Sequence, residues 1–203
     1  MNDMKTLFKE ARDINQFSKS YFRYMFELLN QLDTKKIAEV IREFERARKN
    51  KNTVFFIGNG GSASTASHMA NDLGLGMRVD EKLPFKAMSL TDNVSSITAI
   101  ANDSGYERIF IRQLNLYYKP GDRLVAISAS GNSPNVVAAA EWVRRRKGKV
   151  IGLVGFDGGK LRKLSDICIH VKTSKGEYGP VEDIHMILDH LIYTWLYFKR
   201  RKG

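Results

Sequence analysis

The sequence predicts an α/β fold: a three-layer, doubly wound parallel sheet of about five strands, preceded by an N-terminal helical extension. Its 203 residues suit one domain of roughly 100–200 residues. Short runs rich in Val, Ile and Phe alternate with helical patterns, as in a parallel sheet covered on both faces. No low-complexity linker or repeat of fixed period divides the chain. We therefore expect a helical pair over residues 1–50 and one α/β domain over residues 51–203.

The first quarter of the chain shows the periodicity of two helices. Met4 to Asn30 is predicted to form the first helix. A second helix follows, with Asp33 or Thr34 as its N-cap and apolar residues at helical spacing. These apolar positions are Ile37, Val40, Ile41 and Phe44. Because this pair has an apolar stripe and no motif of its own, we expect it to serve in oligomerisation.

The rest of the chain alternates between predicted strands and helices. Thr53–Ile57 is a short run of β-forming residues that ends at a glycine-rich loop, after which Ser62 caps a new helix. Further strands are expected at Lys86–Leu90, Arg123–Ser128, Lys149–Val154 and Asp166–Val171. The chain closes with a helix from about Pro180 to Arg200. Its predicted apolar stripe is Val181, Ile184, Leu188, Leu191 and Trp195.

The net charge of +11, from 33 Lys and Arg against 22 Asp and Glu, raises the possibility of a nucleic-acid partner. The densest basic runs, however, lie at or near the ends of predicted helices, where cations complement the helix dipole. These runs are Glu45–Lys51, Arg144–Lys149 and Lys199–Lys202. We therefore expect solvated helix ends and no nucleic-acid partner, and the positive charge also suits a phosphorylated small molecule.

Other features of the composition indicate a cytoplasmic protein without a membrane partner. No window approaches the roughly 18 apolar residues of a membrane-spanning helix, and the charged N-terminus lacks a signal-peptide core. Cys168 is the single cysteine and has no partner for an intramolecular disulfide. A reducing compartment is the expected location.

Two loops follow predicted strands at the edge where parallel sheets bind ligands. They are Gly58–Ser62 and Ser128–Pro134. Both lead into helix N-termini, whose free N–H groups suit anions. In the second loop, Pro134 fits the first helical turn and three serine hydroxyls add donors. The pattern resembles a phosphate cradle.

A nucleotide cofactor is not expected at the first loop. Gly58-x-Gly60-x-x-Ala63 satisfies a loose dinucleotide-binding pattern, but that pattern needs an acidic residue roughly 20 residues later, at the end of the next strand. Asp92 comes considerably later. No Gly-Lys-Ser/Thr follows the loop either, which excludes a Walker A motif.

Two pairs of polar residues are candidates for metal binding or acid–base chemistry. His68 and Asp72 are four residues apart on a predicted helix and share one face, and their N and O atoms suit zinc. Glu182 and His190 lie eight residues apart, which is about 12 Å along a helix axis. One straight helix therefore does not bring both to one ion. Either the helix starts irregularly near Pro180, or the two residues act in sites completed by different subunits.

Several motifs resemble, in content and order, those of the phosphoheptose isomerases of the sugar isomerase (SIS) domain superfamily. They are Gly58-Asn59-Gly60-Gly61-Ser62, His68, Asn102-Asp103-x-Gly105, Ser128-x-Ser130-Gly131-Asn132-Ser133-Pro134-Asn135, Asp157-Gly158-Gly159-Lys160 and His185-x4-His190. The resemblance covers nearly the whole chain. It implies a flavodoxin-like SIS domain over residues 51–203, a homotetramer, and a zinc ion at the site. The implied reaction converts sedoheptulose 7-phosphate to D-glycero-D-manno-heptose 7-phosphate.

The same resemblance implies roles for particular residues. Substrate contacts are implied at Asn59, Gly60, Gly61, Ser62, Asn102, Asp103, Ser128, Ala129, Ser130 and Ser133. Zinc-ligand roles are implied at His68, Asp72, Glu182 and His190, and catalytic roles at Asp72, Glu182 and His190. Two positions depart from the family pattern: Asp72 stands where a glutamate is usual, and Glu182 where a glutamine is usual. The shorter Asp72 alters the reach of a base, and Glu182 adds negative charge.

The working hypothesis is an isomerase in which the serine loop holds the phosphate. Asp72 moves a proton between the first two sugar carbons through an enediol, with His190 as its acid partner. A bound metal polarises the sugar oxygens, and in that state both histidines serve as ligands. Glu182 is either a ligand or a neighbour that tunes the base.

The alternative is a non-catalytic SIS protein that binds a sugar phosphate or a protein partner. Such relatives tend to lose the final histidine, so His190 favours the enzyme.

Overall fold

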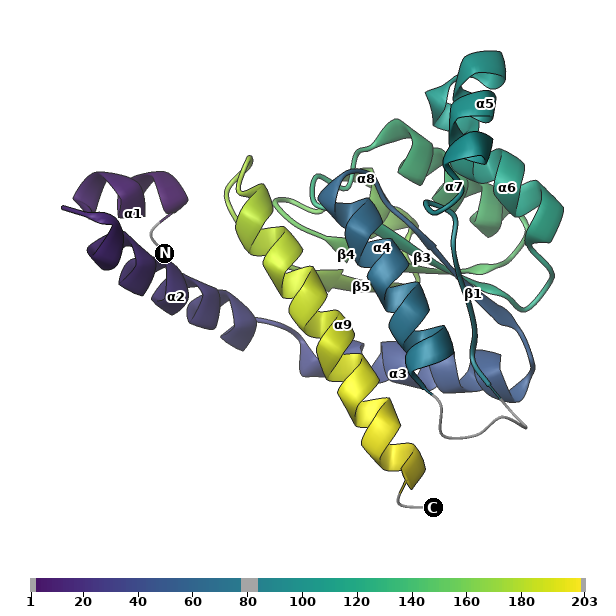
Figure 1. Ribbon diagram of the computed structural model, residues 1–203, viewed down its shortest axis with the longest axis horizontal. Coiled ribbons are helices and arrows are strands. Elements are labelled where there is room, and N and C mark those ends of the chain that lie inside the picture. Colours follow the sequence, from purple (N-terminus) through teal and green to yellow (C-terminus); the bar gives the residue numbers. More distant parts are fainter. Residues whose placement is uncertain (1–2, 78–83, 202–203) are drawn as a thin grey trace.

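A computed structural model, which describes residues 3–77 and 84–201, contains a five-stranded, wholly parallel sheet (Figure 1). The strand order is β2-β1-β3-β4-β5. The strands are β1 (Thr53–Ile57), β2 (Lys86–Ser89), β3 (Arg123–Ser128), β4 (Lys149–Val154) and β5 (Ile167–His170). Each lies where the sequence predicts it, to within a residue at either end. The predicted fold class is confirmed.

Helices precede and connect the strands, and several of them cover the two faces of the sheet. They are α1 (Met4–Glu10), α2 (Ile14–Asn30), α3 (Thr34–Lys49), α4 (Gly61–Asn71), α5 (Val94–Ser104), α6 (Ile109–Tyr117), α7 (Pro134–Arg145), α8 (Gly159–Leu164) and α9 (Tyr178–Arg201). A π-helical turn, η1 (Asp72–Gly76), continues α4, and a short 3₁₀ helix, η2 (Tyr106–Arg108), precedes α6. None of the helices in the described part of the chain has the length and apolar character needed to cross a membrane.

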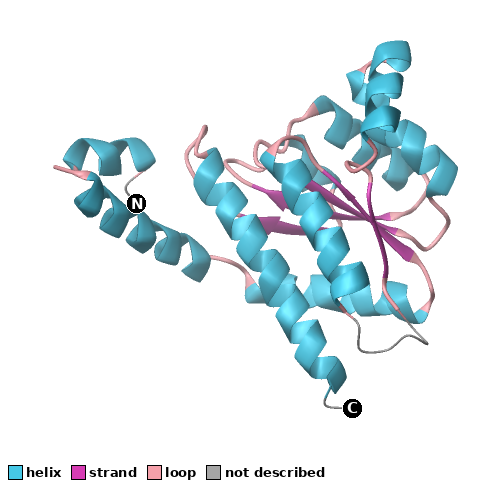
Figure 2. Ribbon diagram, viewed as in Figure 1, coloured by secondary structure: helices cyan, strands magenta, loops and turns pink. Residues whose placement is uncertain are grey.

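The two faces of the sheet bury two separate sets of side chains, because residues alternate along each strand. On β1, Val54 and Phe56 pack in the core beneath α3, α4 and α9. Phe55 and Ile57 point to the other face and pack in the core beneath α6, α7 and α8. Figure 2 shows the strands enclosed between these helices. This three-layer arrangement explains why the strands are apolar throughout.

The N-terminal region contains three helices rather than the predicted pair. The single helix expected over Met4–Asn30 is wrong, because the chain turns at Ala11, where the backbone is extended, and Asp13 caps a new helix by accepting a hydrogen bond from the Gln16 N–H. The last of the three, α3, packs Val40 and Phe44 into the core of the sheet. By contrast, α1 and α2 extend away from the sheet, beside the start of α9 (Figure 1).

The apolar face of α9 differs in phase from the predicted stripe. Beyond Leu188 the buried positions are Ile192 and Leu196, and the predicted Leu191 and Trp195 are 45% and 58% exposed. A step of four from Leu188, rather than three, keeps the buried residues on the side facing the sheet. This rotation also places His185 and Asp189 inside, where they are 0% and 3% exposed.

A buried ion pair joins α3 to the centre of the sheet. Arg123, at the start of β3, donates from its Nε to Glu43 Oε2 at 2.8 Å, and the two side chains are 8% and 9% exposed. Glu43 also pairs with Arg46 at 2.6 Å. Removing one member of a buried pair leaves an uncompensated charge in the interior.

The Glu43→Ala variant is therefore expected to lower the free energy of unfolding by about 3–5 kcal/mol. Glu39→Ala is the matched control, because it removes the half-exposed partner of Lys36 on the same helix. Its expected effect is about 1 kcal/mol or less. Urea denaturation at one fixed protein concentration measures both variants. Equal losses in the two variants would contradict a special role for the buried pair.

Candidate functional site

The ligand-binding edge of the sheet lies between β1 and β3. These strands are neighbours, but the helices that follow them, α4 and α7, pack on opposite faces of the sheet. The loops after the two strands therefore diverge and leave a crevice at the carboxyl ends, which is where open parallel sheets bind ligands. Both loops singled out from the sequence, Gly58–Ser62 and Ser128–Pro134, lie at this crevice.

The two loops are joined by a reciprocal pair of amide hydrogen bonds. Asn59 Nδ2 donates to Asn135 Oδ1, and Asn135 Nδ2 donates to Asn59 Oδ1, both at 2.8 Å. Tyr106 Oη also donates to Asn59 Oδ1 at 3.0 Å. Asn135 is 1% exposed, so the pair is shielded from competing water on that side. The loops are thus held in one relative position.

The second loop gathers three serine hydroxyls at the N-terminus of α7. Ser128 Oγ lies 3.1 Å from Ser133 Oγ and 3.5 Å from Ser130 Oγ. Ser133 is the N-cap residue, but its side chain makes no capping hydrogen bond. Gly131 has φ of +63°, and a Cβ there would overlap the Gly158 carbonyl, so only glycine fits. The hydroxyls and the helix N-terminus together suit a phosphate.

In the first loop the backbone approaches α9 closely. Gly60 has φ of +55°, and a Cβ on Gly61 would overlap the carboxylate of Glu182. Glu182 is half-buried, and burial, together with the nearby Asp183 charge, raises its pKa. Glu182 therefore lies at the glycine loop, at the start of α4.

Helices α4 and α9 pack side by side and run in the same direction (Figure 1). His68 comes seven residues after Gly61, and His190 comes eight residues after Glu182. Because Gly61 and Glu182 are already in contact, nearly equal steps along parallel helices bring the two histidines together. The two imidazole Nε2 atoms are 3.2 Å apart.

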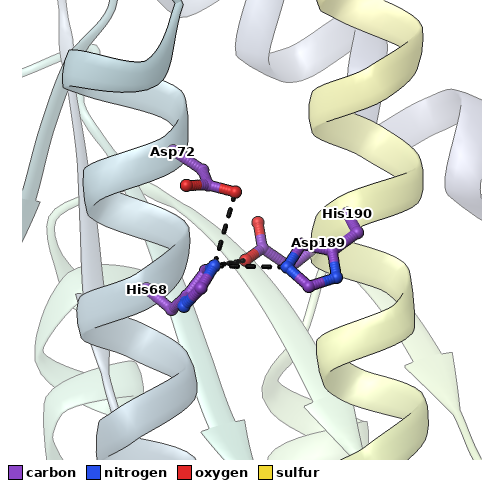
Figure 3. Close-up of side chains that lie close together, drawn as sticks. All are labelled: His68, Asp72, Asp189 and His190. Carbon is purple, nitrogen blue, oxygen red and sulfur yellow. Dashed lines mark hydrogen bonds and ion pairs between the residues drawn. The ribbon is translucent and has the colours of Figure 1, made fainter.

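Two carboxylates complete a compact group around these imidazoles (Figure 3). His68 Nε2 lies 3.5 Å from Asp72 Oδ2 and 3.9 Å from Asp189 Oδ2. One ligand atom from each of His68, Asp72, Asp189 and His190 lies within 4.8 Å of every other. Imidazole nitrogens and carboxylate oxygens are donors that zinc accepts, so the residues fit the expected ion.

Asp189 is the member of the group that sequence reasoning missed. It is 3% exposed, and its Oδ2 has no hydrogen-bond partner among the described residues. Burial, and next the charge of Asp72, raises the pKa of Asp189 to about 7. An acidic residue on the buried face of an amphipathic helix is the signal that could have found it, but the predicted stripe had the wrong phase.

The remaining predicted residues fall in three places. Ser62 is 4% exposed and packs under Gly58. Ala129 is also 4% exposed, and its carbonyl accepts a hydrogen bond from the Gly155 N–H. On α5, the exposed Asn102 donates to Asp103, and neither side chain makes a hydrogen bond to the two loops within the part of the chain described. Glu182 lies at Gly61 and not in the His–Asp group.

An apolar groove of about 820 Å³ borders His190 on the outer side of α9. It lies between α3 and α9. Its lining residues are Thr34, Ile37, Ala38, Ile41, Ile187, His190, Leu191, Thr194, Trp195 and Phe198. Trp195 and Phe198 are each 58% exposed, and Phe22 and Phe26 on α2 are 69% and 65% exposed. The exposed apolar side chains that line the groove are typical of an interaction surface, and α2 carries two more.

Comparison with known proteins identifies the family. The SIS domain family model matches residues 20–155. A phosphoheptose isomerase of Rhodospirillum rubrum is 43% identical over 139 residues, which cover 68% of this chain and 72% of that protein. One from Aliarcobacter butzleri is 38% identical over 173 residues, covering 81% and 90% of the two chains.

Solved structures give the same result. The phosphoheptose isomerase of Neisseria gonorrhoeae superposes with a TM-score of 0.80 at 27% identity, covering 91% of this chain and 98% of that one. The phosphoheptose isomerase of Francisella tularensis superposes with a TM-score of 0.77 at 28% identity, covering 89% and 94%. The resemblance drawn from the loop and histidine motifs is confirmed: the chain belongs to the SIS domain family and, within it, to the phosphoheptose isomerases.

Proposed function

We propose that the chain is an aldose–ketose isomerase that converts sedoheptulose 7-phosphate to D-glycero-D-manno-heptose 7-phosphate through an enediol. The observation that carries the proposal is the group of two imidazoles and two carboxylates between α4 and α9. Two members of the group, His68 and Asp72, belong to the helical segment that begins at the glycine loop. Asn59 and Asn135 join that loop to the serine loop. The phosphoheptose isomerases to which the chain is similar support the substrate and favour an enzyme over a non-catalytic binding protein.

The phosphate is held by the serine loop in this proposal. Ser128, Ser130 and Ser133 supply hydroxyl donors beside the N-terminus of α7. The backbone of Gly60 and Gly61 borders the sugar from the other loop. Glu182, whose carboxylate abuts Gly61, faces this part of the crevice and assists the acid–base chemistry there. Asn59, Asn102 and Asp103 complete the proposed substrate contacts.

The proton transfer is assigned to Asp72. Its carboxylate takes the proton from the hydroxyl-bearing carbon beside the carbonyl, which leaves an enediol, and returns it to the neighbouring carbon. His190 donates a proton to the carbonyl oxygen as the enediol forms, and it takes back the proton of the hydroxyl on the first carbon as the aldehyde forms, so both side chains end in their starting states. His68, His190 and a carboxylate would hold zinc, and the bound ion would supply Lewis-acid polarisation of the sugar carbonyl; in that state both histidines would be ligands.

A homo-oligomer, a tetramer by family resemblance, is the proposed assembly. The apolar groove between α3 and α9 and the exposed Phe22 and Phe26 on α2 support it, because such surface is costly to leave in water. A second copy of this chain is the proposed occupant of the groove. Since His190 lines the groove, the partner would lie next to the site.

The proposed compartment is the cytoplasm. Cys168, the single cysteine of the sequence, is a free thiol on β5. Burial raises its pKa to about 11, so it stays protonated and reacts slowly. A chain that uses no disulfide suits a reducing environment.

Replacement of Ser130 or Ser133 by Ala is expected to weaken binding of sedoheptulose 7-phosphate by about 1.5–3 kcal/mol, or roughly 10- to 150-fold. Each change removes one donor to a charged phosphate. Calorimetric titration in an Asp72→Asn background separates binding from turnover. Ser18→Ala, on α2 and away from the crevice, is the control. Unchanged affinity in both loop variants would show that the phosphate binds elsewhere.

The parent chain is expected to produce aldoheptose phosphate from sedoheptulose 7-phosphate, and Asp72→Asn to lower kcat by roughly 10²- to 10⁴-fold while substrate binding survives. The amide keeps the shape of the side chain but has no basic lone pair. Glu141→Gln, an equivalent change on the outer side of α7, is the control. Near-parental turnover in Asp72→Asn would move the assignment to Glu182, and a parent inactive with and without zinc would favour the binding protein.

Light scattering at micromolar concentration is expected to give the mass of a tetramer for the parent and a smaller mass for Leu191→Lys and Phe26→Lys. Each variant places a charge on an exposed apolar surface. Leu116→Lys is the matched control, because Leu116 is 75% exposed on α6, far from the groove. A monomeric parent would exclude the proposed assembly. Equal dissociation in the control would show that the groove is not the interface.

A further inference from the structure

We propose that Lys175 determines specificity for a phosphorylated sugar, because its ammonium group binds the phosphate that the serine loop holds. Lys175 belongs to residues 171–177, the segment between β5 and α9, for which the sequence predicts no role in the site. The identity of the sugar rests on the proposed function, whereas binding of a phosphate group by Lys175 requires no turnover. Three observations on the described residues support the assignment.

The first observation is a pocket of about 320 Å³ beside the serine loop. Its walls come from the loops that follow β3, β4 and β5, so it lies at the carboxyl edge of the sheet, where ligands bind. Ser130 of the serine loop and Lys175 both line it. The volume falls at the lower end of the range for small-molecule sites, about 300–1,000 Å³. A phosphate on the Ser130 hydroxyl therefore lies in the same pocket as the lysine.

The second observation is the charge balance of this pocket. Lys175 is its single cation, and Asp157 brings a negative charge that disfavours a bound anion unless a cation offsets it. Asn132, also in the wall, is already used: its Nδ2 donates to the Ser130 carbonyl, and its Oδ1 accepts from a backbone N–H of α8, both at 3.0 Å. The exposed Lys175 ammonium makes no hydrogen bond or ion pair within residues 3–77 and 84–201. Its charge is available to a ligand.

The third observation is the way the backbone at Lys175 is held. The Glu177 N–H donates to the Ser174 carbonyl at 3.2 Å and closes a tight turn, with Lys175 and Gly176 between them. Gly176 supplies the positive φ, +97°, that such a turn needs. Glu177 is 8% exposed, and its carboxylate accepts hydrogen bonds from Tyr24 Oη and from the first N–H of α1, both at 2.6 Å. Binding a phosphate therefore has to order only the lysine side chain.

These observations divide the recognition of phosphate between two segments. The serine hydroxyls and the N-terminus of α7 supply dipoles and hydrogen bonds, and Lys175 supplies a full positive charge. Hydrogen bonds between ionised partners are roughly twice as strong as those between neutral ones. A sugar without a phosphate gains nothing from this charge, so Lys175 favours phosphosugars over the corresponding free sugars.

The test compares the parent chain with Lys175→Gln, which removes the charge and keeps most of the side-chain length. Calorimetric titration with inorganic phosphate, and with sedoheptulose 7-phosphate in the Asp72→Asn background, is expected to show a loss of affinity of roughly 3- to 30-fold. Lys172→Gln is the matched control, because Lys172 is exposed on the same segment but does not line the pocket. It is expected to bind both ligands as the parent does. Thermal melting checks that each variant folds.

Two further measurements separate a phosphate ligand from a residue that acts through the fold. Lys175→Arg keeps the charge and is expected to retain most of the phosphate affinity. Added salt is expected to weaken phosphate binding less steeply in Lys175→Gln than in the parent, because one screened charge pair is missing. In the active chain, Lys175→Gln is expected to raise KM for sedoheptulose 7-phosphate while kcat stays within about threefold of the parent.

The proposal is overturned by parental phosphate affinity in Lys175→Gln, by an equal loss in Lys172→Gln, or by a parent that binds neither ligand. A lower kcat at unchanged KM would also contradict it, since that pattern belongs to the chemical step. Failure of the isomerase proposal is distinguishable, because the phosphate titration needs no turnover. A chain that binds phosphate through Lys175 but leaves sedoheptulose 7-phosphate unchanged would refute the isomerase and leave the phosphate contact standing.

Discussion

The close, parallel packing of α4 on α9 determines how the site is built. At the start of this contact Gly61 leaves room for the Glu182 carboxylate, which a Cβ on residue 61 would displace. Small, buried residues such as Ala66 and Ala70 continue the contact along α4. Both helices run away from the carboxyl edge of the sheet, so residues far apart in sequence meet when they stand equally far along their helices. Strand β1 leads directly into the loop before α4 and so sets where α4 begins. At the start of α9, Tyr21 and Tyr24 of α2 donate hydrogen bonds to Asp183 and Glu177.

At the crevice, the polar groups of Asn59 are almost fully used in hydrogen bonds within the protein. Its Oδ1 accepts hydrogen bonds from both Asn135 and Tyr106, and its Nδ2 donates one to Asn135. One amide N–H remains for a ligand. In the proposed site, substrate contacts at this loop would therefore come mainly from backbone groups.

The sequence predicts those features that depend on local chemistry. Strands such as Arg123–Ser128 are uniformly apolar, loops are marked by glycine and serine, and both features survive in the structure. What failed depends on packing between distant segments. The break near Asp13 divides the expected helix in two, and distant contacts hold both parts: Met4 N–H donates to Glu177 Oε1, and Tyr21 Oη donates to Asp183 Oδ2. The burial of Asp189 was not predicted, because the buried face of α9 is shifted by one residue from the predicted stripe. That shift moves Asp189 from the solvent side of the helix to the interior.

The two tryptophans of the chain lie in opposite surroundings, which gives the protein an optical property of its own. Trp142 is 8% exposed, with the Arg146 guanidinium 3.6 Å from the centre of its ring. Trp195 is 58% exposed in the groove bordered by His190. Indole emission shifts to shorter wavelength when water is excluded from the ring. Any molecule that covers the groove therefore changes the colour of Trp195 fluorescence while Trp142 stays constant, so the chain carries both a reporter and its internal reference.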